Sequence, residues 1–269
     1  MTEPAATPDA ADAGWPALRS LTTARIGLQR TGASLATLPL LEFRLAHARA
    51  RDAVHAALGD VPGLDALGLP VLHAATLAEN RHAYLMRPDL GRRLQQDATA
   101  ALALHSLPHA RHHALAVVVA DGLSAAAAER HAVPLLTRLL PALRAEGWFL
   151  APLVVLRQAR VAAGDAVAAA LGTGAVLVLI GERPGLSAPD SLGAYATWAP
   201  HPATTDADRN CVSNIRPAGL GYDDAAFRLA FLLRAMRAGG ASGVGLKDGS
   251  DAAVSIEAAG VGPAHLSRG

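Results

Sequence analysis

The middle of the chain alternates unbroken apolar runs with segments of helical periodicity. The apolar runs occupy residues 115–120, 153–156 and 175–180, and helical spacing fills 124–144 and 162–171 between them. Strands that are apolar on both faces and alternate with helices are typical of βαβ units, in which helices cover both faces of a parallel sheet. The pattern therefore predicts an α/β fold with a Rossmann-like, mostly parallel sheet and flanking helices.

The N-terminal third follows a helical period instead. Apolar residues recur at helical spacing from 38 to 58 and stop at Gly59. Asp89 is placed to cap a second helix that runs to about Leu104, and a short apolar stretch at residues 71–75 separates the two. We therefore expect a helical N-terminal segment ahead of the sheet.

The C-terminal part adds a strand and a helix to this sheet. The strand is expected at residues 194–198, and a polar loop at 209–214 follows it. Asp223 or Asp224 then caps an apolar helix, which two glycines at 239–240 end.

These patterns divide the chain into four parts. Residues 1–20, rich in Ala, Pro and Asp, are interpreted as a flexible arm, and residues 21–110 as the helical N-terminal region. The Rossmann-like domain is predicted over residues 111–247. The Gly- and Ala-rich residues 248–269 are interpreted as a flexible tail.

Charge and composition exclude several classes of function. The 24 basic and 23 acidic side chains leave a net charge of +1, and aromatic residues make up 4% of the chain, so neither nucleic acid nor an anionic membrane is an expected partner. Cys211 is the only cysteine, which rules out an intrachain disulfide and favours a reducing compartment. No signal-peptide layout and no apolar run of ~18 to 20 residues is found, so we expect a soluble, cytoplasmic protein.

The predicted sheet indicates where a ligand would bind. In an open α/β sheet, ligands lie beyond the carboxyl ends of the strands, where loops and helix N-termini face a crevice. This rule selects residues 121–124, 160–161 and 181–185, and the polar loop at 209–214 is a fourth candidate.

Each of these segments also has a purely structural explanation. Residues 121–124 fit an ordinary strand-to-helix turn, and Glu182 beside Arg183 fits a surface ion pair of little energetic value. Cys211 fits a small buried hydrophobe, and Val161 fits simple packing.

Spacing argues against three familiar kinds of metal or catalytic site. The sequence contains a cluster of four histidines: His105, His109, His112 and His113. Pro108 interrupts this cluster, and no cysteine or carboxylate completes a ligand set, so we expect no metal site. Residues 122–125 lack the second glycine of a serine-hydrolase elbow, and the glycines of 172–174 precede a strand, whereas a dinucleotide-binding motif follows one. The residues alone predict a ligand-binding α/β module without a self-contained catalytic set.

Four segments, in this order, resemble the small (light) subunit of ethanolamine ammonia-lyase. They are residues 23–27 (TARIG), 120–125 (ADGLSA), 180–186 (IGERPGL) and 209–216 (RNCVSNIR). The similarity extends from about Leu21 to Gly245. The order of four motifs makes the resemblance more specific than any one of them.

The resemblance implies a subunit that does not act alone. In this family a large subunit carries the substrate site, adenosylcobalamin is held between the subunits, and the complex converts ethanolamine to acetaldehyde and ammonia by a radical mechanism. We therefore expect a lyase subunit with no catalytic residue of its own. The alternative is a stand-alone α/β enzyme or nucleotide-binding module, in which Asp121, Ser124 and Glu182 act within one chain.

The resemblance also implies three cobalamin-contacting residues, which are Val161, Glu182 and Cys211. A carboxylate can accept hydrogen bonds from the amides and ribose of cobalamin, and the other two side chains can pack on apolar surface. The phosphate of the cofactor's nucleotide loop would suit a helix N-terminus such as the one after Gly122.

The sequence lacks an Asp-x-His-x-x-Gly motif, with which some cobalamin proteins supply a histidine to cobalt. We therefore expect the cobalt to keep its dimethylbenzimidazole ligand and this chain to supply no metal ligand. Family members can work inside a bacterial microcompartment, but residues 1–20 show no clear amphipathic targeting helix, so that location stays open.

Overall fold

A computed structural model of the chain describes residues 14–107, 113–246 and 249. Its centre is a seven-stranded mixed sheet with the strand order β3-β6-β4-β7-β8-β9, in which β5 pairs with β4. Strands β3, β4, β5, β6 and β7 run parallel to one another, whereas β8 runs antiparallel to its two neighbours, β7 and β9. The strands are β3 (Val71–Ala75), β4 (Ala114–Ala120), β5 (Phe149–Leu150), β6 (Leu153–Arg157), β7 (Ala175–Gly181), β8 (Leu192–Trp198) and β9 (Arg209–Ile215).

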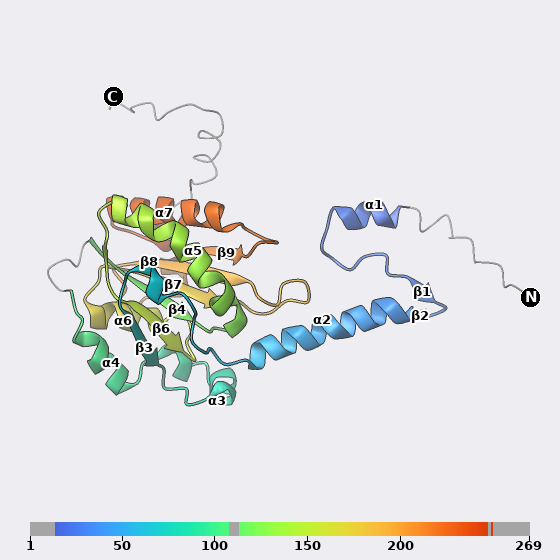
Figure 1. Ribbon diagram of the computed structural model, residues 1–269, viewed down its shortest axis with the longest axis horizontal. Coiled ribbons are helices and arrows are strands. Elements are labelled where there is room, and N and C mark those ends of the chain that lie inside the picture. Colours follow the sequence, from blue (N-terminus) through green and yellow to red (C-terminus); the bar gives the residue numbers. More distant parts are fainter. Residues whose placement is uncertain (1–13, 108–112, 247–248, 250–269) are drawn as a thin grey trace, which may run out of the picture.

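Helices cover both faces of this sheet (Figure 1). Helices α5 and α7 share one apolar core with the sheet, and α4 and α6 pack on the other face. The α-helices are α1 (Trp15–Ser20), α2 (Thr37–His55), α3 (Arg81–Met86), α4 (Gln96–Ala103), α5 (Ala125–Ala145), α6 (Ala163–Leu171) and α7 (Tyr222–Gly239). Short 3-10 helices are η2 (Asp65–Leu67), η3 (Leu90–Arg92), η5 (Asp206–Asp208) and η6 (Gly243–Gly245).

The core explains why the apolar runs form strands. Every residue of β4 and β7 is buried, because these central strands have helices on both faces. Helix α6 approaches β7 closely: a β-carbon on Gly164 would lie 2.4 Å from Cγ2 of Val178. A glycine in the first turn of α6 therefore allows this helix to pack tightly on the sheet.

The predicted α/β class, the mostly parallel sheet and the flanking helices are confirmed. The Rossmann-like topology is not, because the order β3-β6-β4-β7-β8-β9 differs from the 3-2-1-4-5-6 order of that fold and β8 runs antiparallel to both of its neighbours. The structure therefore supports a mixed α/β sheet as its fold class.

Three local predictions differ from the structure. The apolar stretch 71–75 in the predicted helical region is strand β3, at one edge of the main sheet. The predicted polar loop at 209–214 is strand β9, which is buried at only three of its seven positions because an antiparallel edge strand needs one apolar face only. The helix predicted from Asp89 begins at Gln96, because Leu94 first pairs with Thr76.

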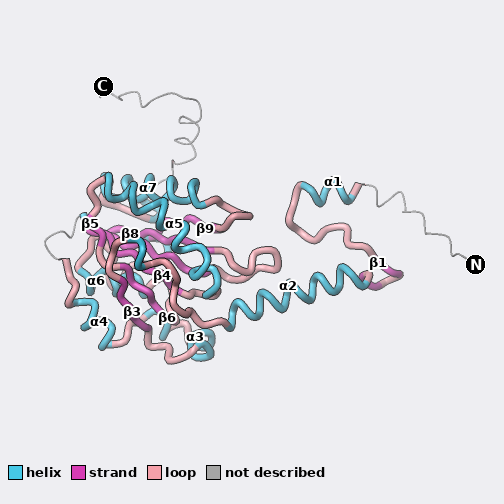
Figure 2. Tube along the Cα trace, in the orientation of Figure 1, coloured by secondary structure: helices cyan, strands magenta, loops and turns pink. Residues whose placement is uncertain are grey.

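The N-terminal segment projects from the body of the molecule (Figures 1 and 2). It contains α1, a small hairpin of β1 (Arg30–Thr31) and β2 (Ser34–Leu35), and α2. Only Ala46 of α2 is buried, while Leu38, Leu41 and Leu45 are each more than half exposed. This helix therefore presents an apolar surface that no other part of the described residues covers.

Helix α1 lies within the arm predicted over residues 1–20, and the rest of that arm lies outside the described residues. Nearly all of the tail predicted over 248–269 lies outside them as well, as do His109 and His112 of the histidine cluster. Among the helices that are described, none is both long and apolar enough to cross a membrane.

Candidate functional site

A pocket opens at the carboxyl ends of β4, β6 and β7, where the strand-end rule predicted a ligand site. Its volume is about 500 Å³, and its lining includes Gly122, Arg160, Val161, Glu182 and Tyr195. The chain leaves β4 for α5 on one face of the sheet and leaves β6 for α6 on the other, so the pocket lies where the connections diverge. We call it the crest pocket.

The structure brings the three predicted site residues to this region. Val161 and Glu182 line the crest pocket directly. Cys211 does not line it, but it lies directly opposite Tyr195 in the pairing of β8 with β9, and Tyr195 does. Cys211 is exposed, so the explanation that it is a buried hydrophobe is wrong.

Glu182 links the ends of three strands. Its carboxylate accepts a hydrogen bond from the Ser191 hydroxyl, just before β8, and one from the backbone N–H of Asn214 in β9, with 3.2 Å between Asn214 N and Oε2. A β-carbon at position 193 would lie 2.9 Å from Glu182 Oε1, so a larger residue than glycine there would displace this carboxylate. Within the described chain Oε1 has no hydrogen-bond donor, which leaves it able to accept one from a ligand.

The side chains of Tyr195 and Cys211 are neutral at ordinary pH. Partial burial raises the pKa of both groups, and the neighbouring carboxylate of Glu182 raises them further. A protonated thiol is a poor nucleophile, so Cys211 is suited to contact a ligand and not to attack one.

Asp121 shapes the loop that carries Arg160 and Val161. Its Oδ2 accepts the backbone N–H of Gln158 at 2.8 Å, and its Oδ1 accepts that of Ala159 at 2.9 Å. Gln158 has a φ of +56°, an unfavourable conformation for this residue type that these two bonds help to hold. Burial raises the pKa of Asp121, whereas the two N–H donors and the nearby Arg81 oppose that rise.

Two guanidinium groups lie over the ring of Tyr84 beside this loop. The centre of the Arg81 guanidinium is 4.7 Å from the ring centroid, and that of Arg160 is 4.3 Å from it. The Tyr84 hydroxyl donates to the carbonyl oxygen of Ala159 at 3.1 Å, and burial raises the pKa of Tyr84 to about 12. The neutral phenol therefore supports the backbone of the loop while its ring supports Arg160.

Asp121 and Ser124, which the stand-alone enzyme hypothesis needs, are both fully buried. The Ser124 hydroxyl donates to the carbonyl oxygen of Pro189 at 2.9 Å, and the N–H of Leu123 donates to Gly181 O at 2.9 Å. These bonds close the turn that begins α5. Neither side chain can reach a substrate, and the helix start after Gly122 is covered by the neighbouring loop.

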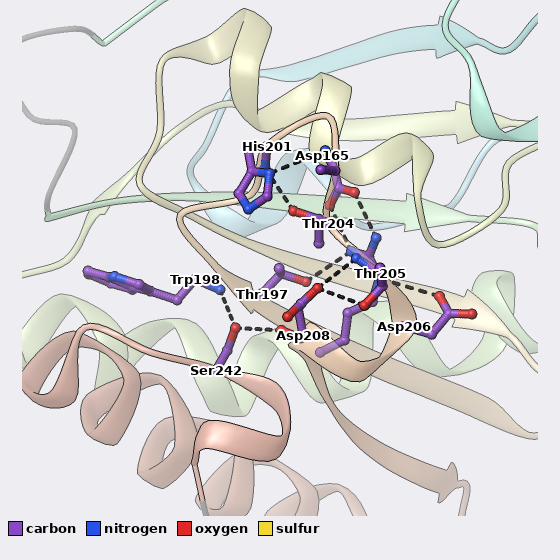
Figure 3. Close-up of polar contacts among 11 residues, drawn as sticks. Asp165, Thr197, Trp198, His201, Thr204, Thr205, Asp206, Asp208 and Ser242 are labelled. Atoms are coloured by element: carbon purple, nitrogen blue, oxygen red, sulfur yellow. Dashed lines mark hydrogen bonds and ion pairs between the residues drawn. The ribbon is translucent and has the colours of Figure 1, made fainter.

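A buried ion pair anchors the strand that carries Cys211. Arg209, at the start of β9, donates to both carboxylate oxygens of Asp165 in α6, each at 2.7 Å, and to the Thr197 hydroxyl at 3.1 Å. Figure 3 shows Asp165, Thr197 and Asp206 grouped at this position, with Thr205, Asp208 and Ser242 beside them. Arg209, the first arginine of the motif RNCVSNIR, therefore has a structural role.

Sequence reasoning missed two residues of the crest pocket. Tyr84 comes from helix α3 and Tyr195 from the middle of β8, so neither follows a strand end. Alternation along β8 marks Tyr195 as facing one side of the sheet, but nothing local shows that α3 packs beside the loop after β6.

The first and third motifs of the resemblance are in contact. The hydroxyl of Ser187 donates to the carbonyl oxygen of Thr23 at 3.3 Å, and Nη2 of Arg25 donates to Leu186 O at 3.4 Å. Segments far apart in the sequence are thus joined next to the loop that follows Glu182.

Comparisons with known proteins show the family to which the chain belongs. The family model for the ethanolamine ammonia-lyase light chain matches residues 12–247. A protein of Bradyrhizobium diazoefficiens is 56% identical over 238 residues, covering 87% of this chain and 90% of its own length. A protein of Azotobacter vinelandii is 51% identical over 257 residues and 94% of each chain, and one of Pseudomonas putida is 52% identical over 240 residues and 88% of each. All three are named ethanolamine ammonia-lyase small subunit. The chain therefore belongs to the ethanolamine ammonia-lyase light-chain, or small-subunit, family.

Proposed function

We propose that this chain is the cofactor-binding subunit of an adenosylcobalamin-dependent ethanolamine ammonia-lyase. It completes the cobalamin site against a large subunit, and the complex converts ethanolamine to acetaldehyde and ammonia. The observation that carries this proposal is the crest pocket, in which Val161 and Glu182 lie together and Cys211 is adjacent through Tyr195.

The residues of the pocket fit one side of this cofactor. Glu182 Oε1 is free to accept from an amide or ribose hydroxyl, Val161 offers apolar contact, and Arg160 Nε is buried without a hydrogen-bond partner. The volume of about 500 Å³ is within the range of about 300 to 1,000 Å³ that encloses drug-sized ligands. A corrinoid is larger than these, so the pocket would cover only one edge of it, as expected of a site completed by another chain.

When bound, adenosylcobalamin supplies the radical chemistry of the reaction through homolysis of its cobalt–carbon bond. The residues of this chain bind and orient: Glu182 accepts hydrogen bonds, while Val161 and Cys211 pack against the cofactor. This chain would supply no ligand to the cobalt. Catalytic groups come from the large subunit, since Asp121 and Ser124 are buried.

The N-terminal segment supports the proposed partner. Its helix α2 exposes Leu38, Leu41 and Leu45, and large exposed apolar surfaces mark interaction sites. We assign the complex to the cytoplasm, with enclosure in a microcompartment as one location to test.

The first experiment separates the subunit proposal from a stand-alone enzyme. The purified chain should release no ammonia from ethanolamine, with or without adenosylcobalamin, and activity should require the large subunit. Turnover by the isolated chain would contradict the proposal.

A second experiment tests the pocket itself. Glu182→Ala should weaken cyanocobalamin binding by the two-subunit complex about tenfold, because a hydrogen bond to a charged acceptor contributes about 1.5 kcal/mol or more. Size-exclusion chromatography should show normal assembly. Asp97→Ala, which removes an exposed carboxylate from α4, is the matched control and should bind normally. Unchanged affinity in Glu182→Ala would remove this residue from the site.

A further inference from the structure

We propose that Arg160 is the anion-binding residue of the crest pocket and that it binds a phosphate group. The inference rests on the proposed function: the phosphate is the phosphodiester of the cofactor's nucleotide loop. Inorganic phosphate offers the same chemistry from a second source, and the experiments below distinguish the two.

The loop after β6 fixes where Arg160 lies. Its backbone N–H donates to Gly91 O at 2.8 Å, and the N–H groups of the two preceding residues are held by the buried carboxylate of Asp121. The guanidinium lies on the Tyr84 ring and lines the crest pocket. Arg160 is therefore positioned before any ligand arrives, which lowers the entropy cost of binding.

Arg160 lacks the acidic partner that comparable arginines have. The other guanidinium on Tyr84, that of Arg81, lies 3.6 Å from Asp121, and Arg209 pairs with Asp165 at 2.7 Å. None of the ion pairs among the described residues includes Arg160, and its Nε is buried without a hydrogen-bond partner. Its one side-chain hydrogen bond there is long, from Nη2 to Tyr84 O at 3.5 Å. A half-buried guanidinium with unused donors is suited to an anionic ligand.

The charges around the pocket permit an anion. Arg160 and Arg183 contribute two positive charges to its lining, and Glu182 contributes one negative charge. The carboxylate of Glu182 already accepts hydrogen bonds from Ser191 and Asn214, at the ends of β8 and β9. The pocket thus keeps a net positive charge.

The helix start after Gly122, which the sequence suggested for a phosphate, is a poorer candidate. The end of β7 packs closely against it, since Leu123 N–H donates to Gly181 O and a β-carbon on Gly181 would lie 2.0 Å from Ser124 O. Arg160 is accessible from the same pocket and carries a full charge. Its planar fork can donate two hydrogen bonds to one phosphate.

The main experiment compares a corrinoid that has the phosphate-bearing nucleotide loop with one that lacks it. Cyanocobalamin carries the nucleotide loop with its phosphodiester, whereas dicyanocobinamide lacks both. In the two-subunit complex, Arg160→Gln should weaken cyanocobalamin binding about ten- to a hundredfold and leave dicyanocobinamide binding unchanged. Arg160→Lys keeps the positive charge but loses the planar guanidinium that can donate two hydrogen bonds to one phosphate. It should therefore weaken cyanocobalamin binding less than Arg160→Gln does.

Arg157→Gln is the matched control, because Arg157 is exposed at the end of the same strand and outside the crest pocket. It should bind both corrinoids as the wild type does. Thermal unfolding of each variant checks that the fold is kept.

Each result has one meaning. Equal losses for both corrinoids, or no loss for cyanocobalamin in Arg160→Gln, would overturn the role of Arg160 while leaving the proposed function intact. A wild-type complex that binds neither corrinoid would instead contradict the proposed function. In that case, calorimetric titration of inorganic phosphate into the chain tests phosphate as the second source. Binding by the wild type that is lost in Arg160→Gln supports an anion site at Arg160. No binding by the wild type overturns it.

Discussion

Arg209 and Asp165 form an ion pair inside the molecule, where either charge alone would be unfavourable. The Arg209 side chain is 2% exposed and that of Asp165 is 14% exposed. Arg209→Met should therefore lower the free energy of unfolding by about 3 kcal/mol, since it leaves a largely buried carboxylate without its partner. Chemical denaturation measures this loss.

The double variant provides the control for this pair. Arg209→Met combined with Asp165→Leu removes both charges, so it should be more stable than Arg209→Met alone. A double variant that loses the sum of both single losses would contradict a coupled pair.

His131 gives the stability of the chain a pH dependence of known sign. Its Nδ1 lies 2.8 Å from the Tyr222 hydroxyl, and burial lowers its pKa below the ordinary 6.5, although Asp190 nearby opposes that shift. The unfolded chain then binds a proton more readily than the folded one. The stability contributed by neutral His131 is present above pH 6.5 and is lost as the pH falls below it.

Urea unfolding at pH 7.5 and 5.5 checks this prediction. His131→Gln should show a smaller loss of stability between the two pH values than the wild type. His82→Gln, which replaces an exposed histidine, should show the same loss as the wild type. Equal pH dependence in His131→Gln and the wild type would exclude His131 as the source.

At the scale of elements, the contact between α6 and β7 depends on one glycine. Gly164→Ala would place a β-carbon 2.4 Å from Val178 Cγ2, so the helix would have to shift away from the sheet. We expect a loss of about 1 to 3 kcal/mol in unfolding free energy, despite the better helix propensity of alanine. Gly239→Ala in α7 is the control, because a β-carbon there meets nothing within 4 Å and should not destabilise.

Helix α2 should be needed for assembly and not for folding. Leu38→Ser with Leu41→Ser changes two exposed side chains, so the unfolding free energy of the isolated chain should change by less than about 1 kcal/mol. If the proposed large subunit covers this helix, its affinity for the variant should fall at least tenfold, since burying each leucine contributes about 1.5 kcal/mol or more.

Co-purification and sedimentation measure that affinity. Leu104→Ser, at an even more exposed position after α4, is the control and should assemble normally. Normal assembly of the α2 variant would place the partner's contact elsewhere.

At the scale of the whole molecule, the sequence predicted those elements whose burial determines their pattern of apolar residues. Strands β4, β6 and β7 were found because the sheet interior requires apolar residues on both faces. Strand β9 was missed because its outward side chains are polar, and β3 because a short run at an edge has no period of its own.

The site was predictable only in part. The strand-end rule located the loops of Val161 and Glu182, because it depends on the order of strands and not on side chains. The roles of Tyr84 and Asp121 could not be read from the sequence. Each depends on a contact between segments far apart in the chain, such as the two hydrogen bonds from Asp121 to residues after β6.

The position of β3 has a consequence for the order in which the sheet forms. Among the described strands, β3 pairs only with β6. β6 lies between β3 and β4 in the sheet, although it follows both of them in the chain. During synthesis, β3 therefore has no partner strand in the main sheet until residues 153–157 have left the ribosome. Parallel pairings between distant segments form slowly and expose apolar edges meanwhile. We therefore expect a nascent chain that ends before β6 to expose the apolar edges of β3 and β4.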